Sequence, residues 1–186
     1  LRWANSWVFW RPWADVLIVF RVEWLPWWVA FGLLAFGVLA FLPRFAAYRR
    51  RNWEVVFIAL ASALIARFGA VELIRFFYNR PRPFEIIADL HRLVSHDRGG
   101  SFPSGHAAFF FALAAVVSRY YPKTSIVFFL AALNLSAARV QAGIHWPSDI
   151  VAGAVIGIIV GLLAHSIFVY SICLKSTIGQ KLYMVI

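Results

Sequence analysis

Charged residues and cysteine are scarce in this sequence. Only 14% of the 186 residues are charged and 62% are hydrophobic, whereas soluble domains carry roughly 25% charged residues, so a soluble globular domain is not expected. The single cysteine, Cys173, has no partner for an intramolecular disulfide. The first residues lack the compact apolar segment of a cleavable signal. We therefore expect membrane targeting to depend on the apolar segments themselves.

Acidic residues are also few, with 8 Asp and Glu against 18 Lys and Arg and a net charge of +10. The arginines are spread between apolar runs, which argues against a nucleic-acid partner and favours contact with membrane lipids. The segments expected to face outward offer only four carboxylates, Glu85, Asp89, Asp97 and Asp149. They lack the paired spacing of a two-metal site. We therefore expect neither a metal ion nor another cofactor.

Long apolar runs dominate the rest of the chain. A helix needs about 20 apolar residues to cross a bilayer, and five runs meet or approach this length: 24–42, 54–78, 104–120, 124–142 and 150–174. They predict an all-α, polytopic transmembrane helical bundle that forms a single domain over residues 1–186. Residues 1–22 alternate Trp and Phe with charged residues, which predicts an interfacial amphipathic helix. A sixth span is the alternative.

A cluster of basic residues after the first run sets the expected topology. Arg44, Arg49, Arg50 and Arg51 follow the run directly and indicate a cytoplasmic loop. Counting spans from there places the loop 79–103 and the connection 143–149 together on the outer side. Because their co-location depends only on the number of spans, it holds in either orientation.

Two patterns inside the spans concern packing. Gly153, Gly157 and Gly161 recur every four residues, so they share one helix face and predict close approach of a neighbouring helix. Arg67 and Glu72 lie within the second span, where an unpaired charge is costly. We expect them to pair with each other or with a polar neighbour.

The first of three polar segments ends the second span. Arg75 and Arg82 are separated by six residues and Pro83 follows, so two guanidiniums can converge on one tetrahedral anion. Taken alone, such arginines more often contact lipid headgroups.

The second polar segment lies where the outer loop meets an apolar run. Ser104 and Gly105 stand at the expected helix N-terminus, where backbone N–H groups and the helix dipole favour an anion. His106 would then lie beside a bound phosphate. Ordinary N-capping by Ser104 is compatible with this role.

The third polar segment combines Arg139, His145 and Asp149. Pro147 suits the first turn of the last helix. Asp149, four residues after His145, can then accept a hydrogen bond from one imidazole nitrogen and leave the other free to attack. As an isolated pair, this spacing is more often structural.

Together, in this order and spacing, the three segments resemble the signature of the type 2 phosphatidic acid phosphatase superfamily, whose members share a helical core with vanadium haloperoxidases. The resemblance covers residues 75–149, about 40% of the chain. Two positions depart from the usual pattern. Arg75 replaces a lysine, and Ala138 replaces a serine whose hydrogen bond would have to come from Ser136 or water.

The resemblance implies a role for each site residue. His145 would attack phosphorus and form a phosphohistidine, Asp149 would orient His145, and His106 would protonate the leaving oxygen and then activate water. The residues implied to neutralise the phosphate oxygens are Arg75, Arg82, Arg139, Ser104 and Gly105.

The short loop between the first two segments, with the stretches 80–84 and 101–104, is similar to bacterial undecaprenyl pyrophosphate phosphatases of the bacitracin-resistance type. This implies hydrolysis of undecaprenyl pyrophosphate to undecaprenyl phosphate in the bacterial plasma (inner) membrane, at a site facing the periplasm or cell exterior. Phosphatidylglycerophosphate and lipid A phosphatases resemble the pattern too. A lipid phosphotransferase and a non-catalytic anion transporter or channel are the other hypotheses.

Overall fold

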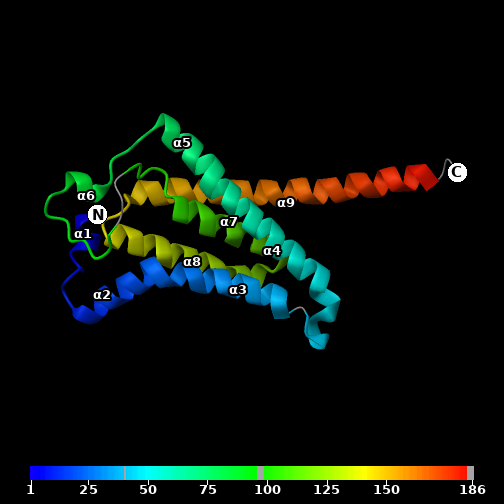
Figure 1. The fold of residues 1–186 in the computed structure, drawn as a ribbon, viewed down its shortest axis with the longest axis horizontal. Helices are drawn as coiled ribbons and strands as arrows, with labels where there is room; N and C mark the ends of the chain where they lie inside the picture. Colours follow the sequence, from blue (N-terminus) through cyan, green and yellow to red (C-terminus); the bar gives the residue numbers. More distant parts are fainter. Residues whose placement is uncertain (40, 96–98, 184–186) are drawn as a thin grey trace.

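The computed structural model describes residues 1–39, 41–95 and 99–183, and these residues form helices and connections without a strand. In chain order the α-helices are α1 (Arg2–Asn5), α2 (Pro12–Val19), α3 (Leu25–Leu39), α4 (Arg49–Leu64), α5 (Val71–Phe77), α6 (Pro83–Ile86), α7 (Gly105–Tyr120), α8 (Pro122–Gln141) and α9 (Pro147–Tyr183). Two π-helical turns, Phe20–Trp24 and Ile65–Ala70, join α2 to α3 and α4 to α5, and the 3-10 segment Pro43–Tyr48 precedes α4. Figure 1 shows the resulting bundle, which confirms the all-α prediction.

Within the described ranges, four helical segments are long and apolar enough to cross a membrane: Pro12–Leu39, Pro43–Phe77, Pro122–Gln141 and Pro147–Leu174. The fifth apolar helix, α7, has 16 residues. At 1.5 Å per residue it is about 24 Å long, shorter than the roughly 30 Å hydrocarbon core. Its residues are buried on most sides, because α4, α8 and α9 surround it. The predicted membrane bundle is therefore organised around a short central helix.

The N-terminal boundary differs from the prediction. We expected residues 1–22 to be separate from a span beginning at Trp24, but Pro12–Leu39 is one continuous helical segment. Its polar residues are held by the bundle: Arg21 donates from Nη2 to the side-chain oxygen of Gln141 at 2.7 Å. Residues 12–22 therefore belong to the same helical segment as the first span, whereas α1 is separate from it.

The segment before α2 is anchored to two distant parts of the chain. Asn5 is 3% exposed, and its Nδ2 donates to the backbone oxygens of His91 at 2.9 Å and Gln141 at 2.8 Å. Its Oδ1 accepts from the backbone N–H of His91 at 2.9 Å. The N-terminus therefore packs over the end of α8 and the loop after α6.

The glycine face of α9 packs directly on α7. A β-carbon at Gly153, Gly157 or Gly161 would lie 2.4, 2.3 or 2.7 Å from the carbonyl oxygens of Ser104, Ala108 and Ala112, respectively. These atoms belong to the backbone, so no side chain can move aside to make room. The predicted close approach is confirmed.

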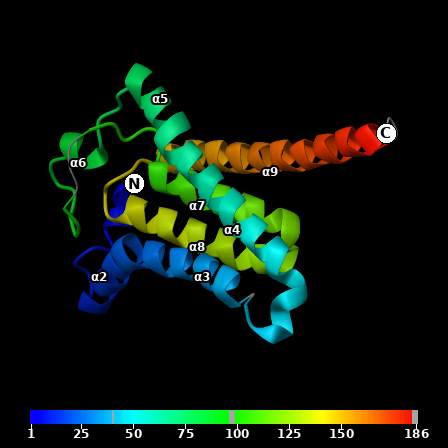
Figure 2. The ribbon, with the colours of Figure 1, turned by 45° about the vertical axis from the view of Figure 1, so that its right-hand side comes forward.

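The two polar connections meet at one end of the bundle. In both views the start of α7, the connection from α8 to α9, and α6 lie at this end, and the connection from α3 to α4 lies at the other (Figures 1 and 2). This confirms the expected co-location of residues 79–103 and 143–149.

Replacement of Gly157 by Ala is expected to destabilise the fold by about 1–3 kcal/mol, because a methyl group forces α7 and α9 apart. Thermal unfolding in detergent measures the change. Gly32→Ala on α3 is the matched control, since a β-carbon added at Gly32 would meet no atom within 4 Å and alanine favours helix. Equal melting temperatures for the two variants would contradict the role of this face.

Candidate active site

All eight predicted site residues are placed around one end of the bundle. Arg75 is in the last turn of α5, Arg82 caps the start of α6, Ser104 caps α7, and Gly105 and His106 begin it. Arg139 is in the last turn of α8, Asp149 is in the first turn of α9, and His145 lies in the connection between them.

His145 and Asp149 form a buried pair, with 2% and 0% of their surfaces exposed. His145 Nδ1 lies 3.4 Å from Asp149 Oδ2, and the backbone N–H of Trp146 donates to the same oxygen at 2.9 Å. The histidine contact is longer than an ordinary hydrogen bond. With Nδ1 toward the carboxylate, Nε2 is the ring nitrogen that points away from it.

Burial lowers the pKa of His145 from 6.5 to about 4, and the positive charges of Arg82 and Arg139 act in the same direction. Asp149 raises the pKa of His145. Because its contact with Nδ1 is long, it offsets only part of the lowering. The ring is therefore neutral at pH 7 and retains the lone pair that a nucleophile needs.

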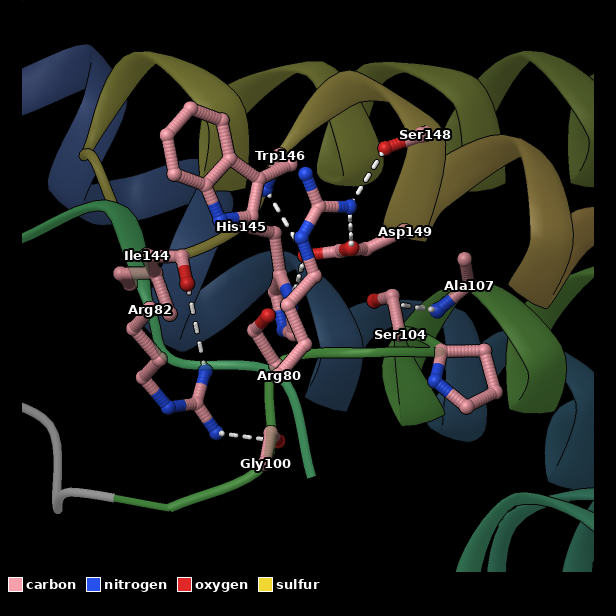
Figure 3. A network of polar contacts seen from close by, with 12 residues as sticks. Arg80, Arg82, Gly100, Ser104, Ala107, Ile144, His145, Trp146, Ser148 and Asp149 are labelled. Carbon is pink, nitrogen blue, oxygen red and sulfur yellow. Dashed lines mark hydrogen bonds and ion pairs between the residues drawn. The ribbon is translucent and has the colours of Figure 1, made fainter. Parts of the chain in front are cut away.

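Arg80 is a site residue that the sequence motifs did not predict. Its Nη1 donates to Asp149 Oδ1 at 3.0 Å and to Ser148 Oγ at 2.7 Å, and its guanidinium carbon lies 4.9 Å from the Trp146 ring centre (Figure 3). One Asp149 oxygen thus faces Arg80 and the other faces His145. The signal in the sequence was its place two residues before Arg82, between two of the motif residues.

Arg82 is buried next to the histidine connection. Its Nη1 donates to the Ile144 oxygen at 3.3 Å and its Nη2 to the Gly100 oxygen at 3.4 Å (Figure 3). Burial, followed by repulsion from Arg75, lowers the pKa of Arg82. Its Nε is buried without a hydrogen-bond partner among the described residues.

As in Arg82, the Nε of Arg75 and the Nε of Arg139 have no hydrogen-bond partner among the described residues. Arg75 donates to the Pro103 oxygen at 3.0 Å, and Arg139 donates to the Val22 oxygen at 3.4 Å. Within the described part of the chain, each Nε is buried and unpartnered. Buried donors are normally satisfied, so three such arginines are suited to an anion. Ser136 Oγ is also buried without a partner there.

The start of α7 is fixed to the start of α9. Ser104 Oγ accepts from the Ala107 N–H at 3.4 Å (Figure 3), and the Ser104 N–H donates to the backbone oxygen of Asp149 at 3.0 Å. The predicted N-cap is confirmed. The Ser104 N–H is thus engaged with Asp149, and a phosphate-binding role for Ser104 stays a prediction. Gly105, as the first helical residue, has no acceptor within its own helix.

Comparison with known proteins identifies the family to which this chain belongs. Residues 52–173 match the PAP2 superfamily. The chain belongs to this superfamily. A protein named bacitracin transport permease protein BcrC from Bacillus licheniformis is 24% identical over 146 residues, which cover 78% of this chain and 68% of that protein.

Two further similarities concern a phosphatase and a solved PAP2-like structure. The lipid A 4′-phosphatase of Bacteroides thetaiotaomicron is 31% identical over 160 residues, covering 77% of this chain and 71% of that protein. The crystal structure of Aquifex aeolicus LpxE superposes with a TM-score of 0.69 at 30% identity, covering 89% and 92% of the two chains. This PAP2 protein is therefore an integral membrane phosphatase with a transmembrane helical fold.

The carboxylates of this PAP2 enzyme are dispersed. Glu85 accepts from the Arg82 N–H at 2.8 Å, Asp89 lies 3.8 Å from Arg2, and Asp149 is in the site, while Asp97 lies outside the described residues. Across the described ranges, no three His, Cys, Asp or Glu side chains gather as a metal site would require. Hydrolysis without a metal stays a prediction.

The low pKa of His145 can be measured directly. In NMR spectra of histidine-labelled protein, with His145→Gln for assignment, the His145 ring is expected to stay neutral down to about pH 4. Between pH 6.5 and 4 the unfolded chain binds a proton that the folded chain excludes at this position, so this residue lowers stability as pH falls. A midpoint near 6.5 would contradict the burial of this ring.

The contact of Arg80 with Asp149 predicts a catalytic effect. Arg80→Gln is expected to lower kcat about 10- to 100-fold, as loss of a hydrogen bond to a charged group implies, with phosphate release as the assay. Arg92→Gln is the control, because Arg92 stacks on Phe84 with 4.3 Å between guanidinium and ring. Equal rates for the two variants would exclude a role for Arg80.

Proposed function

We propose that this PAP2 enzyme removes the terminal phosphate of a polyprenyl diphosphate lipid, converting undecaprenyl pyrophosphate to undecaprenyl phosphate. One observation carries the proposal: a buried His145–Asp149 pair is accompanied by arginines whose buried Nε donors lack partners in the described chain. A neutral nucleophile beside unsatisfied cationic donors suits phosphoryl transfer, which depends mainly on positioning and charge stabilisation.

The reaction would proceed in two steps. Nε2 of His145 attacks the terminal phosphorus, a P–N bond forms, and the bond to the bridging oxygen breaks while His106 donates a proton to that oxygen. Asp149 supports the positive charge on the ring. In the second step His106 accepts a proton from water, the water oxygen bonds to phosphorus, and the P–N bond breaks to release phosphate.

The arginines and the start of α7 would stabilise the transferred group. Arg75, Arg82 and Arg139 supply positive charge, and the Gly105 N–H adds a donor at a helix N-terminus. Ser104 would contribute by holding α7 on Asp149, since its own N–H is engaged there.

The substrate assignment is supported by the sequence stretches at 80–84 and 101–104 and by the surplus of positive charge. Arg80 adds a fourth arginine to the three predicted ones, which suits two phosphate groups better than one. Lipid A phosphate is the second candidate, because a lipid A 4′-phosphatase is 31% identical. We place the enzyme in the bacterial plasma membrane with this end outward, since the Arg44–Arg51 cluster lies at the opposite end and favours the cytoplasm.

Replacement of the nucleophile tests the proposed chemistry. His145→Gln is expected to lower phosphate release from undecaprenyl pyrophosphate by about 10³-fold or more, as loss of a nucleophile does in other hydrolases. The parent protein should incorporate phosphate into an acid-labile, base-stable linkage that the variant lacks. His165→Gln is the matched control, because His165 packs on Tyr120 with 5.2 Å between ring centres.

A panel with lipid A, phosphatidate and phosphatidylglycerophosphate distinguishes substrates in the same assay. Preference for lipid A would replace the proposed substrate, and strict need for a lipid acceptor would indicate a phosphotransferase. Unchanged phosphate release by His145→Gln would exclude the mechanism and favour a non-catalytic anion carrier. Assays in excess chelator complete the test, since recovery with a divalent ion would contradict metal-free hydrolysis.

A further inference from the structure

Arg67 is a charged residue within the candidate span Pro43–Phe77 that the reaction as described does not use. It lies on the π-helical turn Ile65–Ala70, a local distortion that often occurs at functional positions. Its Nη1 forms an ion pair with Glu72, as predicted, and Glu72 also pairs with Arg75 at 3.1 Å. Two guanidiniums thus share one carboxylate.

This arrangement leaves one net positive charge within a membrane-spanning segment. An intramembrane charge is costly and usually marks a binding site or transport path. If Arg67 served only in packing, an apolar residue in its place, or a second carboxylate beside it, would avoid the cost of the surplus charge. The surplus charge therefore favours an anionic ligand.

Arg67 lies directly against the first residue of α7. A β-carbon at Gly105 would be 2.4 Å from Arg67 Cδ, 2.5 Å from its Nε and 2.9 Å from its guanidinium carbon. A side chain at residue 105 would displace the Arg67 guanidinium from this position beside the helix N-terminus, where an anion is favoured. The charge of Arg67 also contributes to the lowered pKa of Arg82, which places both in one electrostatic cluster.

A cavity of about 420 Å³ continues from this position. Arg67, Gly105 and His106 form its polar part, and its other walls include Trp27 of α3, Phe68 of the π-helical turn and two phenylalanines of α7. The volume suits a small amphiphilic group. A ligand there would have an anionic end at Arg67 and an apolar end among aromatic side chains.

We infer that Arg67 binds the leaving-group phosphate of a lipid diphosphate, with the adjoining lipid in this cavity. The inference rests on the proposed function, because His106 must reach the oxygen that leaves, and His106 lines the same cavity. When the bond between the two phosphates breaks, negative charge develops on the phosphate that stays with the lipid. An ester of a simple alcohol has no such group, so Arg67 selects diphosphates.

The test compares hydrolysis and product inhibition with a soluble short-chain probe, farnesyl diphosphate. Arg67→Gln is expected to lower kcat/KM about 10- to 100-fold, the effect of removing a charged hydrogen-bond donor. It should raise the inhibition constant of farnesyl monophosphate about 10-fold and leave that of inorganic phosphate unchanged. Arg67→Lys should restore most of both losses, because it keeps the charge.

Glu72→Gln separates binding by Arg67 from support of Arg75. It keeps the Arg67 charge, so inhibition by farnesyl monophosphate should persist. The inference is overturned if Glu72→Gln reproduces the whole effect of Arg67→Gln, if both inhibitors weaken equally, or if neither changes. Melting temperatures identify a variant that fails to fold. If Arg67→Gln does not fold, Arg67→Lys is compared with the parent in its place. Failure of the proposed function is distinct: the parent itself would release no phosphate from the diphosphate.

Discussion

The hydrogen bond from the Ser104 N–H to the Asp149 carbonyl oxygen, 3.0 Å long, joins the first turns of α7 and α9. It forms because the glycine face of α9 lets the two backbones approach within a distance that no side chain would permit. The helix that carries His106 and the helix that carries Asp149 are thereby fixed to each other at the catalytic end. Arg75 and His145 lie next to this contact, since their partners are the Pro103 oxygen and the Asp149 carboxylate.

Arginine side chains then close around this junction by using backbone oxygens. Arg75 binds the Pro103 oxygen and Arg82 binds the Ile144 oxygen, each directly before a site residue. Neutral carbonyls hold the guanidiniums in place without cancelling their charge. Carboxylate partners would have neutralised the charge that a phosphate requires. Asp149 and Glu72 are exceptions: the charge of Asp149 is shared between Arg80 and His145, and Glu72 pairs with Arg75.

Much of the site could be predicted from sequence because phosphate chemistry requires particular residue types at fixed spacing. His145 and Asp149 were paired by a four-residue interval at a helix start, and Arg67 and Glu72 by the cost of charge in a membrane. Arg80 was missed because its partner lies 69 residues away. The bond from the Ser104 N–H to the Asp149 oxygen was missed for the same reason, since only the packed helices reveal this acceptor.

The length of the first helix also depended on a distant partner. Charges near residue 21 suggested a helix end, yet Arg21 reaches Gln141 at the end of α8. The local sequence shows that a charged residue lies in an apolar run, where it is costly. It does not show which distant group will pair with that charge. In this protein the same cost has two outcomes. Arg21 is held by a neutral amide, whereas Arg67 and Arg75 share a single carboxylate, which leaves positive charge at the end of the bundle that carries the candidate site.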